Sequence, residues 1–494
     1  MKRPNQNTPL NFTEKYKSRI SLIVSVVTLV ILCIFLTQMD QILIQQPRQE
    51  QAEQQKLEEE QQALAAAEPD VYTASFVAVG DNRFSDALIS SGYNEEAGTY
   101  SYDSIYAQIS QEISSADFAI VNQETVFTED SSSYIGEDTF ASPTAVGDAL
   151  VNAGFDGIAS ATNHMDDFGS SMLTETLNYW NTSHPDIQVL GIHDSETDAG
   201  NITIIEVNQI QIALLDYTSS TYTGNLSDEE SYMLDQLDQS AVAADISTAK
   251  SSSDCVIVIA NWGNEEDEEV GTEQQEWANF LLSQGVLVTI GMNPRVVQPY
   301  ETITDASGNS MLVYYSLGNF VSTQNMVPRL LEGMAKFTIE KTVPQDTTQP
   351  ATIRVTSSSL EPMVMHYNYD ENVYAVYMLS DYTEDLASSH SIHGLSDEEF
   401  TVSSLQTQFS ERTGSTVLST GDTGDSADTS GDSSSDGSTD TSASGDSSDT
   451  SGASSSDGST DTSSSDSSDT GDSSETDSSS ETDSSTETDS SSEY

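Results

Sequence analysis

The 494-residue chain is predicted to form an α/β body between one transmembrane helix and a disordered acidic tail. Three observations predict this arrangement. An uninterrupted apolar run lies near the N-terminus, and short apolar runs alternate with helix-like stretches through the middle of the chain. From residue 413 to residue 494 the sequence is almost entirely Ser, Asp, Thr, Gly and Glu.

The apolar run near the N-terminus predicts a membrane anchor. Residues 20–39, ISLIVSVVTLVILCIFLTQM, supply about the twenty apolar residues that a bilayer core requires. Basic residues precede the run and Asp40 follows it, so the positive-inside rule places residues 1–19 in the cytoplasm and the main domain outside the cell. A cleaved signal peptide is the alternative, but the run is long for one and lacks a small-residue cleavage site. Residues 40–69, rich in Gln, Glu and Ala, predict a helical stalk or flexible linker.

The formal net charge of −66 limits the partners of the chain. Residues 70–420 contain 53 acidic residues against 8 basic ones. Such a surface repels nucleic acid phosphates, which excludes DNA and RNA as partners. Cys33 and Cys255 are too few for a disulfide scaffold or a thiolate metal site. The tail, residues 413–494, cannot bury enough apolar surface to fold, and serves either as a spacer or as a cation-binding, wall-threading brush.

Six short apolar runs in the predicted body, residues 70–412, are expected to be buried strands because few charges interrupt them. They span residues 75–81, 118–124, 157–164, 255–263, 286–291 and 311–319. Helix-like stretches precede the second, third and fifth runs, an alternation that is typical of α/β proteins. Two further strands, in GMAKFTIEK and ATIRVTSSSLEPMVMHY, and a short final helix complete the predicted body.

The ends of these runs predict a functional site. Five of the six end on, or just before, a side chain that can hold a metal or a substrate. These are Asp81, Glu124, Asn163 with His164, Asn261 and Asn293. A single Asp or Asn at the end of a strand is weak evidence, because these residues are common in turns. Because ligands gather at the carboxyl ends of strands in α/β sheets, five in chain order indicate a single site.

The blocks around these strand ends resemble those of the CapA-like family of poly-γ-glutamate capsule biosynthesis proteins. They are VAVGDNRF, ADFAIVNQETVFT, NAGFDGIASATNHMDDFG, VIVIANWGNEEDE, LLSQGVLVTIGMNPRVVQPYE and VYYSLGNFV, between residues 73 and 321. The resemblance implies a metallophosphatase-like, layered α/β/β/α sandwich, as in the calcineurin-like metallophosphoesterases. It also implies a metal pocket in which Asp81, Glu124 and Asn163 are ligands. His164 and Asp167 would form the catalytic pair, His164 moving a proton.

Two blocks depart from the family pattern. Where the family usually has His-Trp-Gly, this chain has Asn261-Trp262-Gly263, and where it has His-His-Pro-His, this chain has Met292-Asn293-Pro294-Arg295. Asparagine still offers a neutral oxygen, whereas arginine cannot ligate a cation. We therefore expect at most one divalent ion (Mg, Mn, Ca or Zn), or none. Asn261, Asn293 and Arg295 are predicted to bind substrate, with Arg295 either a surface charge or a clamp for an anionic group.

Two functions follow from the resemblance. The first is a membrane-anchored extracellular protein that acts in synthesis, transfer or attachment of a capsular or cell-envelope polymer such as poly-γ-glutamate. Its chemistry would be metal-assisted hydrolysis or transfer at a phosphoryl or acyl centre. The alternative is a catalytically inactive pseudoenzyme of the same fold that binds envelope polymer or scaffolds its assembly. The expected partners are the polymer, the lipid bilayer and a membrane-bound polymer synthase.

Overall fold

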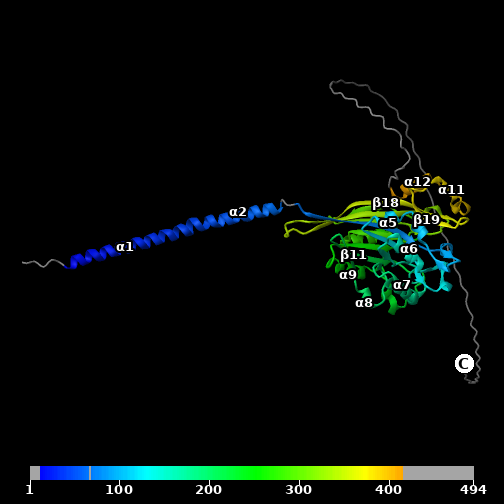
Figure 1. Cartoon of the computed structure of the whole chain (residues 1–494), viewed down its shortest axis with the longest axis horizontal. Helices are drawn as coiled ribbons and strands as arrows, with labels where there is room; N and C mark the ends of the chain where they lie inside the picture. The colour runs from blue at the N-terminus through cyan, green and yellow to red at the C-terminus, as the bar shows by residue number, and fades with distance from the viewer. Residues whose placement is uncertain (1–11, 66–67, 415–494) are drawn as a thin grey trace, which may run out of the picture. The chain divides into compact units, whose positions relative to one another are not determined.

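The computed structural model describes residues 12–65 and 68–414. The first of these segments is helical: α1 (Phe12–Asp40), a short π-helical stretch η1 (Gln41–Gln45) and α2 (Gln46–Ala65) (Figure 1). Within the described residues, Arg19–Ala63 is long and apolar enough to cross a membrane, a test that a signal sequence also passes. The predicted anchor at residues 20–39 lies within this helix. All but the first two residues of the predicted tail lie outside the described residues.

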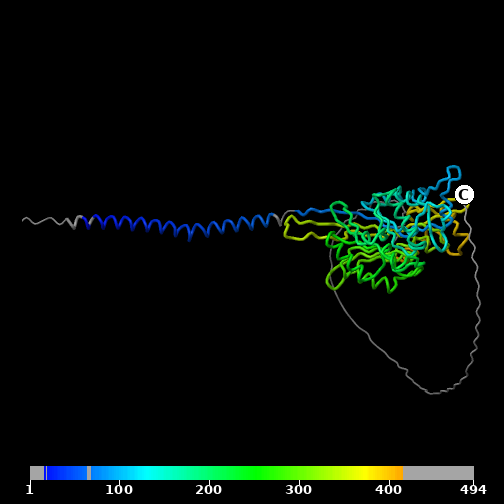
Figure 2. Tube along the Cα trace, turned by 90° about the horizontal axis from the view of Figure 1, so that it is seen from below, coloured from blue at the N-terminus to red at the C-terminus, as the bar shows by residue number. Residues whose placement is uncertain are grey.

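The body begins at β1, which belongs to the first of two large sheets. This sheet has eight strands, seven of them in one continuous order. The order is β19-β18-β17-β1-β4-β8-β9, and β16 also pairs with β1. The bounds are β1 (Asp70–Asn82), β4 (Phe118–Gln123), β8 (Gly157–Ala159), β9 (Gln188–Leu190), β16 (Asn319–Val321), β17 (Leu331–Val343), β18 (Thr352–Asn368) and β19 (Val373–Met378). Strands β1, β4, β8 and β9 are parallel, whereas β17, β18 and β19 are joined antiparallel. Strands β17 and β18 run beside β1 in the Cα trace (Figure 2).

The second sheet has the order β10-β11-β12-β13-β15-β14. Its strands are β10 (Thr203–Val207), β11 (Ile210–Thr218), β12 (Cys255–Asn261), β13 (Val288–Met292), β14 (Tyr300–Thr304) and β15 (Ser310–Tyr314). The six predicted apolar runs overlap β1, β4, β8, β12, β13 and β15, and the two further predicted strands overlap β17 and β18. Strand β8 is only the first three residues of run 157–164, and run 311–319 continues beyond β15 to the first residue of β16. Strand β11 is absent from the predicted set, although IQIALLDYT has the same apolar composition as the others.

Two small sheets and several helices complete the body. The small sheets pair β2 (Tyr93–Asn94) with β3 (Thr99–Tyr100), and β7 (Thr139–Pro143) with β5 (Val126–Thr128) and β6 (Ile135–Glu137). The helices are α3 (Asp86–Ser91), α4 (Asp103–Tyr106), α5 (Ser110–Ser114), α6 (Ala145–Ala153), α7 (Gly169–Ser183), α8 (Glu196–Ala199), α9 (Gln239–Lys250), α10 (Thr272–Gln284), α11 (Glu384–Ser389) and α12 (Val402–Thr413). The last of these is the predicted final helix.

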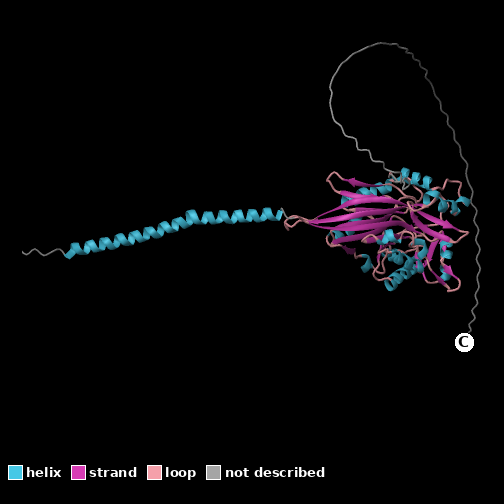
Figure 3. Ribbon diagram, turned by 45° about the horizontal axis from the view of Figure 1, so that its top comes forward, coloured by secondary structure: helices cyan, strands magenta, loops and turns pink. Residues whose placement is uncertain are grey.

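The two large sheets pack face to face around the main core. Phe76 of β1 stacks on Phe337 of β17 at 5.1 Å, and Phe337 meets Tyr314 of β15 at 6.3 Å between ring centroids. Apolar residues of α9 and α10 pack against the opposite face of the second sheet, and α4, α5 and α6 pack together against the first. Helices therefore lie on both sides of the paired sheets (Figure 3), which confirms the predicted layered α/β/β/α arrangement.

The parallel strands bring the predicted strand ends to one edge. In the first sheet Asp81 pairs with Asn122 of β4 and with Asn319 of β16. In the second sheet Asn261 pairs with Met292, the last residue of β13. Side chains that follow these strands therefore leave the sheets at corresponding ends, as the sequence predicts.

Gly80 allows an unusually close backbone approach at this edge. The amide of Asp81 donates to the carbonyl oxygen of Gly318 at 3.1 Å. A Cβ at position 80 would stand 1.9 Å from that same oxygen, so no other residue fits without moving the backbone. Gly80 thereby fixes the position of the neighbouring Asp81.

We expect Gly80→Ala to lower the free energy of unfolding by at least ~1–3 kcal/mol, because the added methyl group must displace the Gly318 backbone. Urea denaturation followed by far-UV circular dichroism measures this. Gly394→Ala is the matched control, since a Cβ at position 394 meets no atom within 4 Å. Equal stability of the two variants would contradict the close approach.

Candidate functional site

The predicted strand ends meet around the side chain of Arg295, which is 1% exposed. Its Nη1 donates to Asp81 Oδ2 at 3.0 Å. Its Nη2 forms an ion pair with Glu124 and donates to Glu265 Oε1 at 3.0 Å and to Asn163 Oδ1 at 3.2 Å. One guanidinium from the second sheet is thus held by oxygens from both sheets. The three predicted metal ligands, Asp81, Glu124 and Asn163, all contact it.

The loop that carries Arg295 is tied down by Asn293. Asn293 Nδ2 donates to the carbonyl oxygens of Gly263 at 2.8 Å and Trp262 at 3.3 Å. Both Asn293, with φ 92°, and Arg295, with φ 66°, have left-handed backbones. Arginine adopts this conformation rarely, at a cost of about 1–3 kcal/mol that surrounding contacts must offset. The buried ion pairs of Arg295 supply those contacts.

His164 and Asp167 lie together as the sequence predicts. His164 Nδ1 is 3.0 Å from Asp167 Oδ2, and its Nε2 is 3.7 Å from Glu124 Oε1. Asp167 Oδ2 also accepts from the Phe140 amide at 2.9 Å, which fixes the carboxylate. The Phe140 ring meets the imidazole edge-on, with 4.8 Å between ring centroids. Asp167 therefore orients His164 towards Glu124.

Burial and charge set the ionisation of the cluster. Burial raises the pKa of Asp81 to about 6, against the opposing effect of Arg295. Burial also acts to raise the pKa of Glu124, but Arg295 and Arg83 together outweigh it and hold that pKa below its ordinary value. For Arg295 burial acts to lower the pKa, and Glu124 and Asp81 reverse this and raise it. At neutral pH the centre therefore contains ionised carboxylates around a permanent cation.

These residues do not fit a divalent metal ion. Asp81, Glu124 and Asn163 each direct an oxygen to the Arg295 guanidinium, whose fixed positive charge repels a second cation at the same oxygens. Across residues 12–65 and 68–414, no group of three or more His, Cys, Asp or Glu side chains could hold a metal. The guanidinium lies where a cation bound by these ligands would lie.

Asn261 and Asn293 lie at the border of this cluster. Asn261 Oδ1 accepts from Thr218 Oγ1 at 3.1 Å, and Asn293 secures its own loop. In the described part of the chain, no hydrogen bond joins either side chain to Arg295. Their predicted role in substrate binding stays a prediction. Arg295, also predicted to bind substrate, is buried and engaged by the chain's own carboxylates rather than by an open cavity.

Sequence reasoning missed three residues of the site. Glu265, the third carboxylate on Arg295, lies in the acidic run NEEDEE that follows Trp262 and Gly263. Arg83 follows Asp81 by two residues in VAVGDNRF, and its Cζ lies 4.2 Å above the Phe140 ring. Phe140, which also contacts His164, belongs to β7, outside the six predicted strands. Only proximity to matched blocks could have indicated Glu265 and Arg83.

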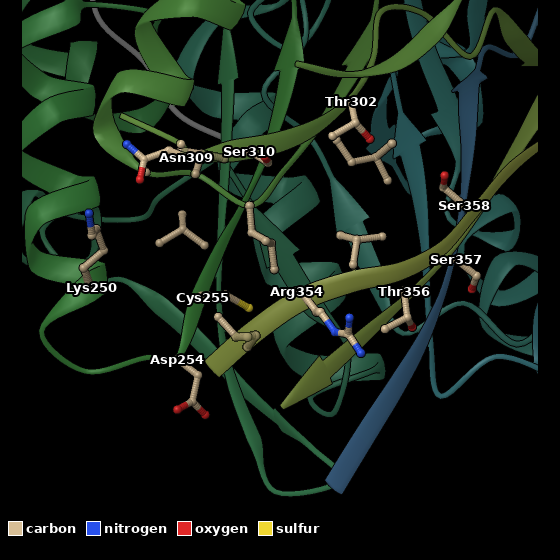
Figure 4. Close-up of a pocket in the computed structure, with 18 residues that line it drawn as sticks. Lys250, Asp254, Cys255, Thr302, Asn309, Ser310, Arg354, Thr356, Ser357 and Ser358 are labelled. Carbon is tan, nitrogen blue, oxygen red and sulfur yellow. The ribbon is translucent and has the colours of Figure 1, made fainter. Parts of the chain in front are cut away.

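A cavity of about 570 Å³ lies apart from this site, beside β18 and the beginnings of β12 and β15 (Figure 4). Its basic side chains are already engaged. Lys250 Nζ donates to the Gln284 carbonyl oxygen at 2.9 Å, and Arg354 Nη2 lies 2.7 Å from Glu340. Burial raises the pKa of the Cys255 thiol to about 12, so this thiol stays protonated. The cavity therefore offers neither a free cation nor a reactive thiolate.

Comparisons with known proteins agree with the predicted resemblance. The capsule biosynthesis protein CapA of Bacillus anthracis is 26% identical over 247 residues, 48% of this chain and 58% of that protein. The PGA biosynthesis protein CapA of Bacillus subtilis (strain 168) is 27% identical over 193 residues, 39% of this chain and 49% of that protein. The chain thus spans about half the length of these relatives.

Among solved structures, a calcineurin-like phosphoesterase from Bacillus subtilis matches with 10% sequence identity and a TM-score of 0.34, covering 69% of this chain and 98% of that one. Residues 75–324 match the family described as bacterial capsule synthesis protein PGA_cap. Since this match takes in half of the 494 residues, the chain belongs to the bacterial capsule synthesis protein family PGA_cap.

Proposed function

We propose that this protein takes part in synthesis, transfer or attachment of a capsular polymer as a binding or scaffolding module, not as a metal-dependent hydrolase. One observation carries the proposal: the Arg295 guanidinium is bound by Asp81, Glu124 and Asn163. A catalytic metal polarises an oxygen of the substrate or activates a water at an open coordination position. A guanidinium has no such position, and Nη1 and Nη2 of Arg295 are directed at side chains of the protein.

The family supports a capsule-related function, and the finer assignments are part of this proposal. Poly-γ-glutamate is the proposed polymer because the chain's blocks resemble the CapA-like family and a relative is named for PGA biosynthesis. Residues 20–39 would anchor the chain in the membrane with its main domain outside the cell. A membrane-bound polymer synthase is the proposed protein partner. The strongly acidic body would repel a polyanion except where a cation is presented.

In this proposal Arg295 supplies the positive charge that a metal ion would place between the carboxylates, but it does not supply the catalytic chemistry of a metal. Asp81 lies at the end of β1 and Glu124 directly follows the adjacent β4. Both carboxyl groups are fully buried, so a nearby positive charge is needed to keep them ionised. Arg295 supplies that charge from the loop after β13 and joins the two sheets. The fold can then keep the shape of the strand-end edge independently of any metal supply.

We expect Arg295→Met to lower the free energy of unfolding by ~3–5 kcal/mol, because it leaves buried carboxylates without their counter-charge. Chemical denaturation of the full chain measures this loss. Arg354→Met is the matched control. The Arg354 side chain pairs with Glu340 but is 69% exposed, so we expect the free energy of unfolding to change by only ~0–1 kcal/mol.

The same variant has a diagnostic pH dependence. Without Arg295, the buried carboxyl groups hold protons in the folded state at pH values where the unfolded chain has released them. The folded state then binds more protons, so its stability rises as the pH falls from 7 towards 5. The deficit of Arg295→Met should shrink over this range. A deficit that stays constant would contradict the assignment of buried, charged carboxylates.

Metal analysis tests the proposed function directly. After incubation with Mn²⁺ or Zn²⁺ and dialysis, the wild-type full chain should retain no stoichiometric metal. Arg295→His should retain about one equivalent, because it removes the repelling charge, frees the oxygens of Asp81, Glu124 and Asn163, and adds an imidazole. Arg354→His controls for the change in net charge.

The opposite results would favour the catalytic alternative. One equivalent of metal in the wild-type chain, lost on Asp81→Ala, would contradict the proposal. Metal-dependent hydrolysis of a phosphate ester by the wild-type chain would do the same, particularly if His164→Gln abolished it.

A further inference from the structure

Arg83 is the exception among the basic residues of the body. Residues 70–414 contain eight Lys or Arg side chains. Six form ion pairs with carboxylates: Arg295, Arg329, Lys336, Lys341, Arg354 and Arg412. A seventh, Lys250, donates to a backbone carbonyl. Within this described stretch, Arg83 alone has neither an ion pair nor a hydrogen bond to a backbone carbonyl, and its guanidinium lies over the face of Phe140. In so acidic a body, an unpaired arginine requires an explanation.

Arg83 lines a cavity of about 280 Å³ whose lining does not include Arg295, Asp81 or Glu124. The β6–β7 hairpin, including Phe140, and the segment after β16 form its walls. Ser322 lines the same cavity; it is 1% exposed, and its hydroxyl has no hydrogen-bond partner among the described residues. Ser85 and Thr323 add two more hydroxyls, 2.5 Å apart. One cavity thus combines an unpaired guanidinium with an unsatisfied buried hydroxyl.

An anionic oxygen would pair with both groups. Ser322 is buried, and a buried hydroxyl without a partner is unfavourable, so it indicates a missing hydrogen-bond partner. Arg83 is partly exposed, so its guanidinium is accessible to a ligand in the cavity. The planar guanidinium matches a carboxylate or a phosphate with two parallel hydrogen bonds. The Phe140 ring, 4.2 Å from Arg83 Cζ, holds the guanidinium by a cation–π contact and leaves its N–H edge for the ligand.

Charge and size favour a carboxylate over a phosphate. Glu137 and Asp138 line the same cavity, and Glu124 lies close enough to act on Arg83 electrostatically. A doubly charged phosphate would meet more repulsion from these carboxylates than a singly charged group would. The volume falls just below the usual range of roughly 300–1,000 Å³ for drug-sized ligands, which suits a small group.

We propose that Arg83, Ser322 and Phe140 form a binding site for one carboxylate group of a small or polymer-borne ligand. Phe140 also contacts His164, so this carboxylate site lies beside the Arg295 centre. The proposal goes beyond the function proposed above, because it does not depend on whether a metal binds near Asp81. The two proposals are tested separately. Metal analysis of Arg295→His tests the proposed function, and carboxylate binding tests the proposed carboxylate site.

Isothermal titration calorimetry on the full chain in a nonionic detergent tests the site, with glutarate as the probe. We expect one glutarate per chain. Arg83→Gln should weaken binding by at least about tenfold, since it removes a charge-assisted pair of hydrogen bonds. Arg354→Gln removes the same charge elsewhere and should leave the affinity unchanged. Inorganic phosphate should bind at least about tenfold more weakly than glutarate.

A second variant keeps the test decisive if Arg83→Gln fails to fold. Ser322→Ala removes one hydroxyl that has no partner within the described protein, so its far-UV spectrum and melting temperature should be unchanged. Its affinity for glutarate should fall about threefold or more. The proposal is overturned if the wild-type chain binds no glutarate, if folded Arg83→Gln or Ser322→Ala binds it as tightly as the wild type, or if phosphate binds more tightly than glutarate.

Discussion

The rest of the strand-end edge depends on the buried ion pairs between Arg295 and the carboxylates of Asp81 and Glu124. Asp81 is the penultimate residue of β1 and Glu124 directly follows the adjacent parallel strand β4, and neither carboxylate is exposed to water. Two neighbouring buried carboxylates stay ionised at neutral pH only with a cation between them. The cation comes from the opposite sheet, and this explains why the loop after β13 adopts left-handed conformations at two residues that are not glycine. It also explains why Asn293 is used to tie that loop to the backbone at Trp262 and Gly263.

The acidic loop after β12 is also held in place by ion pairs with arginines. Glu265, Glu266 and Glu268 pair with three arginines from three different elements: Arg295 after β13, Arg329 at the end of η4 (Val327–Arg329) and Arg412 in α12. The pairs of Glu266 and Glu268 involve carboxylates more than half exposed, so each contributes little stability by itself. Together they place the loop against the site. With only eight basic residues in the body, three are directed at one short acidic run. This loop is therefore a positioned part of the edge rather than a solvated charge run.

The sequence predicts the strand-end geometry better than the orientation of single side chains. Parallel strands share a carboxyl edge, so Asp81, Glu124, Asn163 and His164 could be placed together from the order of the apolar runs alone. The departures from the family pattern at Asn261, Asn293 and Arg295 are equally visible in the sequence. The inward direction of Arg295 is not, because it depends on backbone angles that no local pattern encodes for arginine. Glu265 lies among other acidic residues, and the sequence does not distinguish it from them. The lack of an ion-pair partner for Arg83 depends on where all the charged side chains of the folded body lie, which the sequence does not give. Strand β11 has the same apolar composition as the predicted strands, so its sequence carries the signal for a buried strand.

An arginine side chain and an exchangeable metal ion differ in the chemistry that they make possible at the site. A metal ion exchanges ligands, accepts water and leaves coordination positions free for a substrate, and its occupancy follows supply and pH. A guanidinium keeps its protons and its charge throughout the accessible pH range, and its hydrogen bonds are fixed by the loop that carries it. The oxygens of Asp81 and Glu124 that contact Arg295 are engaged within the protein. His164 and Asp167 lie beside Glu124 as an oriented pair. Among the basic side chains of the described residues 70–414, Arg83 alone has neither an ion pair nor a hydrogen bond to a backbone carbonyl, so the proposed recognition of an anionic group is assigned to Arg83 and not to the buried Arg295.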